Sequence, residues 1–133
     1  MRVYVAGASK EPGRVRQAMD WVDADPNLEL TQDWLTDIEN EVSDDQLTHD
    51  QRVHYAFKDL SAVWRSKVIW VLIPNNQSVG CWVELGYALG AGRPGTHVVI
   101  SGKSQGVIFC AMGMEFGEDE AAFFYVQKIG LGL

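Results

Sequence analysis

The sequence predicts an α/β fold: a doubly wound (Rossmann/flavodoxin-like), mostly parallel five-stranded sheet with helices on both faces. Two observations predict it. Apolar residues recur alternately at strand-like and helix-like spacing, and strands that alternate with helices form parallel sheets. Residues 68–73 (Val-Ile-Trp-Val-Leu-Ile) are an unbroken apolar run, which is typical of a strand buried on both faces of such a sheet.

The first predicted strand covers residues 3–6 and ends at Gly7. A helix follows, because Pro12 suits the first turn of a helix and Pro26 cannot continue one. Its apolar residues recur at helical spacing: Val15, Ala18, Met19 and Val22. Residues 28–31 are predicted to form a second, weaker strand.

Residues 32–47 are polar and acidic, and they are predicted to be a long loop, which in a compact domain is usually functional or mobile. Thr48 or Asp50 could cap the next helix. That helix is the clearest of the chain, because its apolar residues follow the i, i+3, i+4, i+7 rule: Val53, Ala56, Phe57, Leu60, Val63 and Trp64.

The second half of the chain continues the alternation after Pro74 ends the apolar run. The predicted elements are a loop at 75–80, a helix at 81–91, a turn at 92–95, a strand at 97–101, a short helix at 104–110, a strand at 112–116 and a helix at 118–129.

The length and composition suit one globular domain, residues 1–133. The chain has 133 residues, of which 47% are hydrophobic and 22% are charged. Its net charge of -7 argues against a partner that is a nucleic acid polymer, since that needs a basic face. A small anionic ligand stays compatible with this charge, because backbone N–H groups and hydroxyls can bind one phosphate.

No sequence feature predicts a metal, a cofactor or a membrane segment. The three histidines share no metal-ligand spacing with acidic or cysteine partners, and neither a Walker-type loop nor a full dinucleotide glycine fingerprint is present. No apolar run reaches the length of a membrane span, and the N-terminal run is too short for a signal peptide. Cys81 lies among apolar residues and is expected to be a buried free thiol. We expect a cytoplasmic protein.

In doubly wound sheets, ligands bind beyond the carboxyl ends of the strands. This rule directs attention to residues 7–11, 32–34 and 75–84. Glu84 is predicted to lie in the first turn of a helix that follows the buried strand, where a carboxylate is favoured by the helix dipole. Position alone leaves two interpretations open: Glu84 serves only the helix end, or it performs chemistry.

The motif Gly80-x-x-x-Glu84-Leu85-Gly86-Tyr87-Ala88 resembles the nucleoside 2-deoxyribosyltransferase family, which includes the 2'-deoxynucleoside 5'-phosphate N-hydrolases. Three further segments resemble this family: the opening strand 3–7, Lys58-Asp59-Leu60 and the polar–Trp segment 31–34. The resemblance extends from Arg2 to about Met114.

The resemblance implies a catalytic role for three residues. Glu84 would attack the anomeric carbon of a sugar and expel the base, giving a transient glycosyl ester. Attack needs an ionised carboxylate, and the helix start is expected to lower the pKa of Glu84. Tyr4 would orient Glu84, and Asp59 would protonate or hold the leaving base. The alternatives are a structural strand tyrosine and a surface helix carboxylate.

The resemblance also implies substrate-binding residues. Transferases of the family carry an acidic residue at the position of Ser78, whereas the phosphate-dependent hydrolases carry a serine there, so Ser78 favours a nucleoside 5'-monophosphate. The phosphate would bind at the loop Ser78-Val79-Gly80, and its site would be completed by Gly7, Ala8 and Ser9. The substrate would also contact Asp33 and Trp34. Cys110 replaces the serine that a neighbouring subunit provides in the hydrolases. The acidic segment 36–50 could be a lid or could select the base.

Three hypotheses follow: an N-hydrolase of nucleoside 5'-monophosphates, a transferase that exchanges bases on free nucleosides, and a nucleotide-binding module without catalysis. The resemblance implies a homodimer or higher homo-oligomer with shared active sites. The five tryptophans agree with this expectation, because not all of them can be buried in one small core: Trp21, Trp34, Trp64, Trp70 and Trp82.

Overall fold

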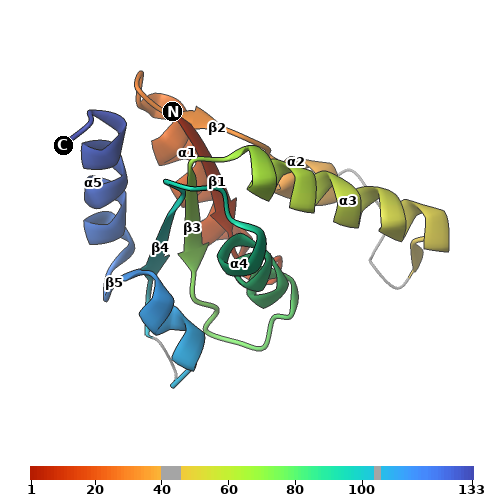
Figure 1. Cartoon of the computed structure of the whole chain (residues 1–133). Coiled ribbons are helices and arrows are strands. Elements are labelled where there is room, and N and C mark those ends of the chain that lie inside the picture. Colours follow the sequence, from red (N-terminus) through yellow and green to blue (C-terminus); the bar gives the residue numbers. More distant parts are fainter. Residues whose placement is uncertain (40–45, 104–105) are drawn as a thin grey trace.

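Five parallel strands form one sheet in the computed structural model, which describes residues 1–39, 46–103 and 106–133. The strand order is β2-β1-β3-β4-β5, and every neighbouring pair is parallel. The strands are β1 (Arg2–Ala6), β2 (Glu29–Leu30), β3 (Val68–Leu72), β4 (His97–Ser101) and β5 (Met114–Phe116). The predicted fold class is therefore confirmed (Figure 1).

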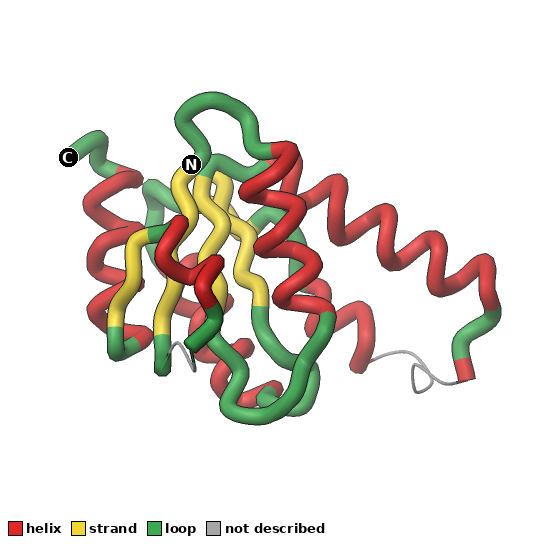
Figure 2. Tube along the Cα trace, turned by 60° about the horizontal axis from the view of Figure 1, so that its bottom comes forward, coloured by secondary structure: helices red, strands yellow, loops and turns green. Residues whose placement is uncertain are grey.

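Helices cover both faces of this sheet (Figure 2). They are α1 (Pro12–Ala24), α2 (Trp34–Glu39), α3 (His49–Arg65), α4 (Gly80–Ala91), the 3-10 helix η2 (Ile108–Met112) and α5 (Asp119–Gly130). Helices α1 and α5 contact each other on one face, and α3 and α4 contact each other on the other. No helix in the described ranges is both long and apolar enough to cross a membrane.

The central strand β3 explains the unbroken apolar run of the sequence. It lies between β1 and β4, and all five of its residues are buried. The Trp70 ring stacks on Trp21 of α1 and Phe123 of α5, with ring centroids 6.5 and 5.9 Å away. Because helices cover both sides of β3, each of its side chains faces apolar neighbours and none faces solvent.

The direction of the chain reverses between β1 and β3. From β1 the chain moves outward to β2, and it then crosses back to β3 on the other side of β1. Such a reversal leaves a crevice beyond the carboxyl ends of the two strands. The residues after Ala6 and after Leu72 lie at this crevice, because Ala6 pairs with Val71 in the register.

The structure corrects the prediction of a loop over residues 32–47. Helix α2 lies within this segment, and its Trp34 and Leu35 are buried. Asp33 explains the start of the helix, because its side chain accepts a hydrogen bond from the backbone N–H of Thr36 at 2.9 Å. The surrounding carboxylates hid this apolar turn in the sequence. Residues 40–45, part of the predicted lid, lie outside the described residues.

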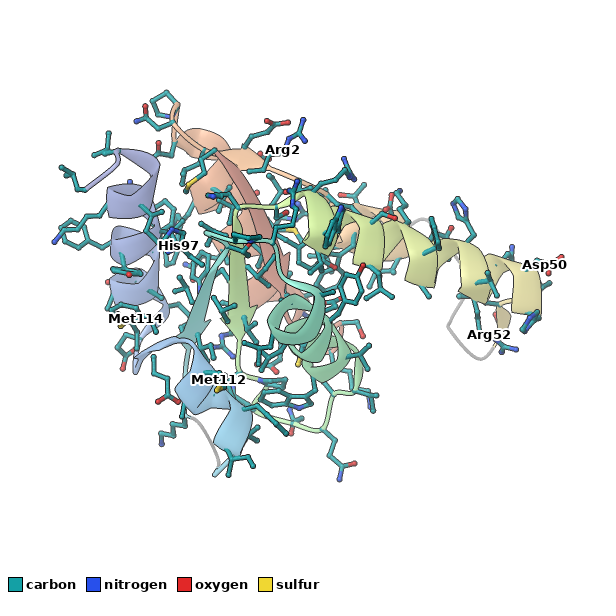
Figure 3. All side chains as sticks on the ribbon, in the orientation of Figure 1. Arg2, Asp50, Arg52, His97, Met112 and Met114 are labelled. Atoms are coloured by element: carbon teal, nitrogen blue, oxygen red, sulfur yellow. The ribbon has the colours of Figure 1, made fainter. Side chains whose placement is uncertain are left out.

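Two further boundaries differ from the prediction. The short helix expected at 104–110 is a 3-10 helix at Ile108–Met112, and the last strand begins at Met114. Residues 104 and 105 lie outside the described residues. Of the two predicted caps for α3, Thr48 is the N-cap, and it forms a capping box with Gln51. The outer end of α3, with Asp50 and Arg52, extends away from the sheet (Figure 3).

Candidate active site

A cavity of about 740 Å³ opens at the crevice beyond the carboxyl ends of β1 and β3. Its lining comes from the loop after β1, from α2 and α3, from the loop before α4, and from α4 itself. All three segments that the strand-end rule indicated, residues 7–11, 32–34 and 75–84, contribute to the lining. The volume is in the usual range for small-molecule sites, about 300–1,000 Å³.

Glu84 lines this cavity, and its carboxylate is held by a hydrogen bond from Tyr4. The phenol of Tyr4 donates a hydrogen bond to Oε1 of Glu84 at 2.9 Å. Tyr4 comes from β1 and is fully buried, whereas Glu84 comes from α4, 80 positions later. Cys81 and Leu85 of α4, three residues before and one residue after Glu84, are buried, so this side of the helix faces the interior of the protein.

The pKa of Glu84 is raised to about 8, chiefly by burial; the hydrogen bond from Tyr4 opposes this shift, and the negative charge of Asp59 adds to it. The expectation that the helix start lowers this pKa is therefore wrong. Helix α4 begins at Gly80, so Glu84 is its fifth residue and lies past the first turn. The dipole effect is largest within the first turn and is therefore weaker at Glu84. The loss of hydration inside the cavity wall outweighs the remaining dipole effect.

Asp59 lines the same cavity from α3. Its Oδ1 accepts a hydrogen bond from Nε2 of Gln32 at 2.7 Å, and burial raises its pKa above the ordinary value. The adjacent Lys58 pairs instead with Asp37 of α2 at 2.6 Å. Oε1 of Gln32 is buried and has no hydrogen-bond partner among the described residues. Asp59 thus lies in a poorly hydrated setting, without a cation in direct contact in the part of the chain described.

The loop after β1 and the loop before α4 form the polar wall of the cavity. Gly7, Ala8, Ser9 and Lys10 line it from the first loop, and Gln77, Ser78 and Val79 line it from the second. Gly7 is required by packing, because a Cβ there would lie 2.8 Å from a methyl group of Val15. The residues of this wall include two with hydroxyl groups, Ser9 and Ser78, and one with an ammonium group, Lys10.

Asp33 and Trp34 were predicted together as substrate contacts, but they face different surroundings. Trp34 lines the cavity, and its indole N–H donates to the backbone oxygen of Val5 at 2.7 Å. Asp33 is not among the lining residues, and Arg16 of α1 binds its carboxylate at 2.7 and 3.1 Å. Its observed contacts connect α1 to the start of α2.

Cys110 is also absent from the cavity lining of this chain. It is fully buried on η2, and burial raises the pKa of its thiol. Its neighbours Ile108, Phe109 and Met112 are exposed. Gly80 lines the cavity as the first residue of α4, and a Cβ there would meet no atom within 4 Å.

The sequence reasoning missed several lining residues, of which Lys10 and Tyr55 are the most informative. Lys10 lies inside the segment 7–11 that the strand-end rule indicated, so its charge could have been noticed. Tyr55 precedes Asp59 by one helical turn on α3, so the i, i+4 spacing was an available signal. Ile38 and Leu47 gave no such signal, because they fall in the segment predicted as a loop.

A second polar cluster, defined by Arg14, Ser101 and Asp119, lies at the same end of the sheet. The Arg14 guanidinium pairs with the Asp119 carboxylate through contacts of 2.8 and 2.9 Å, and it donates to the backbone oxygen of Ile73 at 2.5 Å. The Ser101 hydroxyl donates to Asp119 at 2.7 Å. The hydrogen bonds from Arg14 and Ser101 hold the pKa of Asp119 below its usual value despite partial burial.

Within the described residues, no group of three or more His, Cys, Asp or Glu side chains is arranged to hold a metal ion. Both cysteines are free thiols and both are buried, as expected for Cys81.

Comparisons with known proteins show the fold of the chain. No protein-family profile matches it, and no curated protein sequence matches it. Among solved structures, it is similar to the CMP N-glycosidase BcmB of Clostridium botulinum, with a TM-score of 0.54 and 17% sequence identity. The alignment covers 100% of both chains. At this identity the similarity establishes a shared fold over the whole length.

Proposed function

We propose that this protein hydrolyses the N-glycosidic bond of (deoxy)nucleoside 5'-monophosphates, giving the free base and (deoxy)ribose 5-phosphate. The observation that carries the proposal is the Glu84 carboxylate in the cavity wall, which accepts a hydrogen bond from the buried phenol of Tyr4. In the described part of the chain, no Lys or Arg side chain pairs with Glu84. The fold shared with a CMP N-glycosidase supports the same proposal.

In the first step, an oxygen of Glu84 attacks C1' of the sugar; the reactive form is the one in which Glu84 is ionised, and its share rises as the pH approaches the pKa of about 8. The C1'–N bond breaks, its electron pair moves to the base nitrogen, and a glycosyl ester of Glu84 forms. The phenol of Tyr4 fixes the carboxylate for attack through its 2.9 Å hydrogen bond. Because a base anion leaves poorly, protonated Asp59 donates a proton to the departing base, and burial favours that protonated form.

In the second step, water attacks C1' of the glycosyl ester. Asp59, now a carboxylate, accepts a proton from the water, and Glu84 leaves as a carboxylate. The sugar therefore keeps its anomeric configuration over the two displacements. The two carboxyl groups share one cavity and their charges repel, which suits groups that alternate between protonated and ionised forms.

The 5'-phosphate would occupy the wall formed by residues 7–10 and 77–80. The hydroxyls of Ser9 and Ser78 and the backbone N–H groups there can donate to phosphate oxygens. Lys10 lines the cavity next to Ser9, and its ammonium group can add a positive charge to the binding of the phosphate.

The test is incubation with nucleoside and deoxynucleoside 5'-monophosphates and with the matching unphosphorylated nucleosides, followed by chromatography of the released base. We expect release from the monophosphates and its loss in Glu84→Ala. Faster turnover of free nucleosides in the presence of an acceptor base would show the transferase instead. Binding of monophosphates without turnover would show a nucleotide-binding module.

Adding a negative charge at Ser78 sharpens the test of substrate class. Ser78→Asp adds a carboxylate to the phosphate wall, and like charges repel, so kcat/KM for monophosphates should fall by about 30-fold or more. The values for free nucleosides should change much less. Lys10→Gln should lower the monophosphate values in the same direction, with Lys128→Gln on α5 as the matched control. Equal losses for both substrate classes would refute the phosphate assignment.

We propose that the chain forms a homodimer or larger homo-oligomer, in which a neighbour brings the segment around Cys110 to the cavity. Exposed apolar side chains support this: Phe57 is 74% exposed on α3, and Ile108 and Phe109 are 75% and 59% exposed on η2. As expected, not all tryptophans are buried, since Trp64 is 44% exposed. Sedimentation should give a dimer or larger, and a strict monomer would contradict this.

The two free thiols support a cytoplasmic location.

A further inference from the structure

Two loops form the polar wall of the cavity, and they come from distant parts of the chain. The first follows β1 and includes Ser9 and Lys10, and the second follows β3 and includes Gln77 and Ser78. A ligand that contacts both loops requires a fixed separation between them. Glu11 makes a direct side-chain link between the two loops.

The Glu11 carboxylate holds residue 75 at two points. Its Oε2 accepts the backbone N–H of Asn75 at 3.0 Å, and its Oε1 accepts the side-chain amide of Asn75 at 2.9 Å. Oε1 also lies 3.4 Å from a guanidinium nitrogen of Arg14. The Glu11 side chain is only 13% exposed, and neither Glu11 nor Asn75 lines the cavity. The link therefore lies behind the polar wall.

Glu11 is itself rigidly held. Its backbone N–H donates to Ala8 at 3.0 Å, which closes the turn that carries Ser9 and Lys10. Its backbone oxygen accepts from Val15 at the start of α1. Arg14, which faces its carboxylate, is anchored by Asp119 and by the backbone oxygen of Ile73 at the end of β3. A shift of the second loop would therefore have to break contacts with a fixed carboxylate.

We infer that Glu11 is a positioning residue that sets the distance between the two phosphate-binding loops and thereby determines affinity for the phosphorylated end of the substrate. It does so without contacting the substrate. This inference rests on the proposed function, because the loops are assigned there to the 5'-phosphate. Without Glu11, the backbone from residue 75 to residue 80 is held less firmly, whichever ligand the two loops bind.

Glu11→Gln is the informative variant, because it keeps the size of the side chain. A glutamine offers one acceptor oxygen, so its NH₂ group would face either the N–H or the amide of Asn75, and one of the two bonds is lost. Asn75→Ala, at an exposed position, removes only the side-chain bond and serves as the second variant. Glu29→Gln on β2 is the matched control, because Glu29 is 66% exposed and does not line the cavity.

The experiment measures kcat and KM for a nucleoside 5'-monophosphate and for the matching free nucleoside. For the monophosphate, KM should rise about tenfold in Glu11→Gln and about threefold in Asn75→Ala, with kcat within about twofold. The double variant should resemble Glu11→Gln alone, because both changes act on one contact. The free nucleoside and the Glu29→Gln control should show unchanged values.

Hydrogen exchange of the ligand-free protein separates this inference from the proposed function. Amides of residues 75–80 should exchange faster in Glu11→Gln and Asn75→Ala but not in Glu29→Gln. If the wild-type protein releases no base, the proposed function fails, and exchange alone decides the positional role of Glu11. Unchanged exchange in both variants would overturn the inference, as would equal losses of kcat for the phosphorylated and unphosphorylated substrates.

Discussion

Two polar clusters lie at the same end of the sheet, and they treat their carboxyl groups in opposite ways. In the cluster of Arg14, Ser101 and Asp119, the carboxylate is paired with a guanidinium and its pKa is lowered. In the cavity, Glu84 accepts one hydrogen bond from Tyr4, and its pKa is raised to about 8. The two carboxyl groups differ because Asp119 is paired with the Arg14 guanidinium, whereas no cation pairs with Glu84 in the described residues.

This difference separates a structural site from a candidate catalytic one. Asp119 has both of its oxygens engaged by Arg14 and Ser101, so it connects α1, β4 and α5. Glu84 lines the cavity, accepts a hydrogen bond on Oε1 alone, and lacks a compensating charge in the described structure. A carboxyl group that the fold leaves unpaired, at a cost to stability, is a candidate for chemistry.

The largest expected effect is on catalysis at Glu84. Glu84→Gln keeps the size of the side chain but removes the nucleophilic oxygen charge, so kcat for base release should fall by about 10³-fold or more. The protein should stay folded, because Tyr4 can donate equally well to the amide oxygen. Glu29→Gln is the control for the substitution itself. An active Glu84→Gln enzyme would remove the basis of the proposed function.

The same change of carboxylate to amide at Asp119 should act on stability instead. Asp119→Asn leaves Arg14 partly unpaired, so the free energy of unfolding should fall by about 2–3 kcal/mol, measured by urea unfolding. The loss should shrink as the pH falls below 3.8, since the lowered pKa of Asp119 stabilises the fold only above that range. Asp23→Asn, at an exposed position of α1, should cost less than about 0.5 kcal/mol.

Tyr4→Phe should have an intermediate effect and should move the pH profile. Loss of the hydrogen bond raises the pKa of Glu84 further, because that bond favours the ionised form. We expect kcat/KM at neutral pH to fall about tenfold, with its rising limb displaced from about pH 8 to higher pH. Tyr125→Phe on α5, on the other face of the sheet, should leave the profile unchanged. An unshifted limb in Tyr4→Phe would contradict the coupling.

A last expected effect is a stability difference at Glu84 with the opposite pH dependence to that at Asp119. The native protein keeps the Glu84 proton up to a pKa of about 8, whereas the unfolded chain loses it near 4.5, so this group costs stability as the pH rises between these values. Glu84→Gln should therefore have a melting temperature on the order of 10 °C higher than wild type at pH 8 and nearly equal at pH 4. A difference independent of pH would show that burial does not govern Glu84.

Local patterns predicted most of the secondary structure, because their signals lie within one element. The apolar run 68–73 predicted β3, and Thr48 with the apolar stripe behind it predicted α3. Helix α2 was missed, because its apolar turn is short and is recognisable only when Trp34 packs beneath β1 and donates to Val5. Its stability depends on tertiary packing rather than on propensity.

The sequence by itself determined the order of elements, the strand ends at which a ligand would bind, and the choice of Glu84, Asp59 and Tyr4 as residues to question. Only the tertiary structure decided that Tyr4 donates to Glu84, that Lys10 joins the cavity, that Glu11 links its two loops, and that Glu84 holds its proton to about pH 8. The physical reason is that periodicity is a property of neighbours in the chain. Hydration, charge and hydrogen bonding at a buried carboxyl group depend instead on neighbours in space, here as far apart as 80 positions.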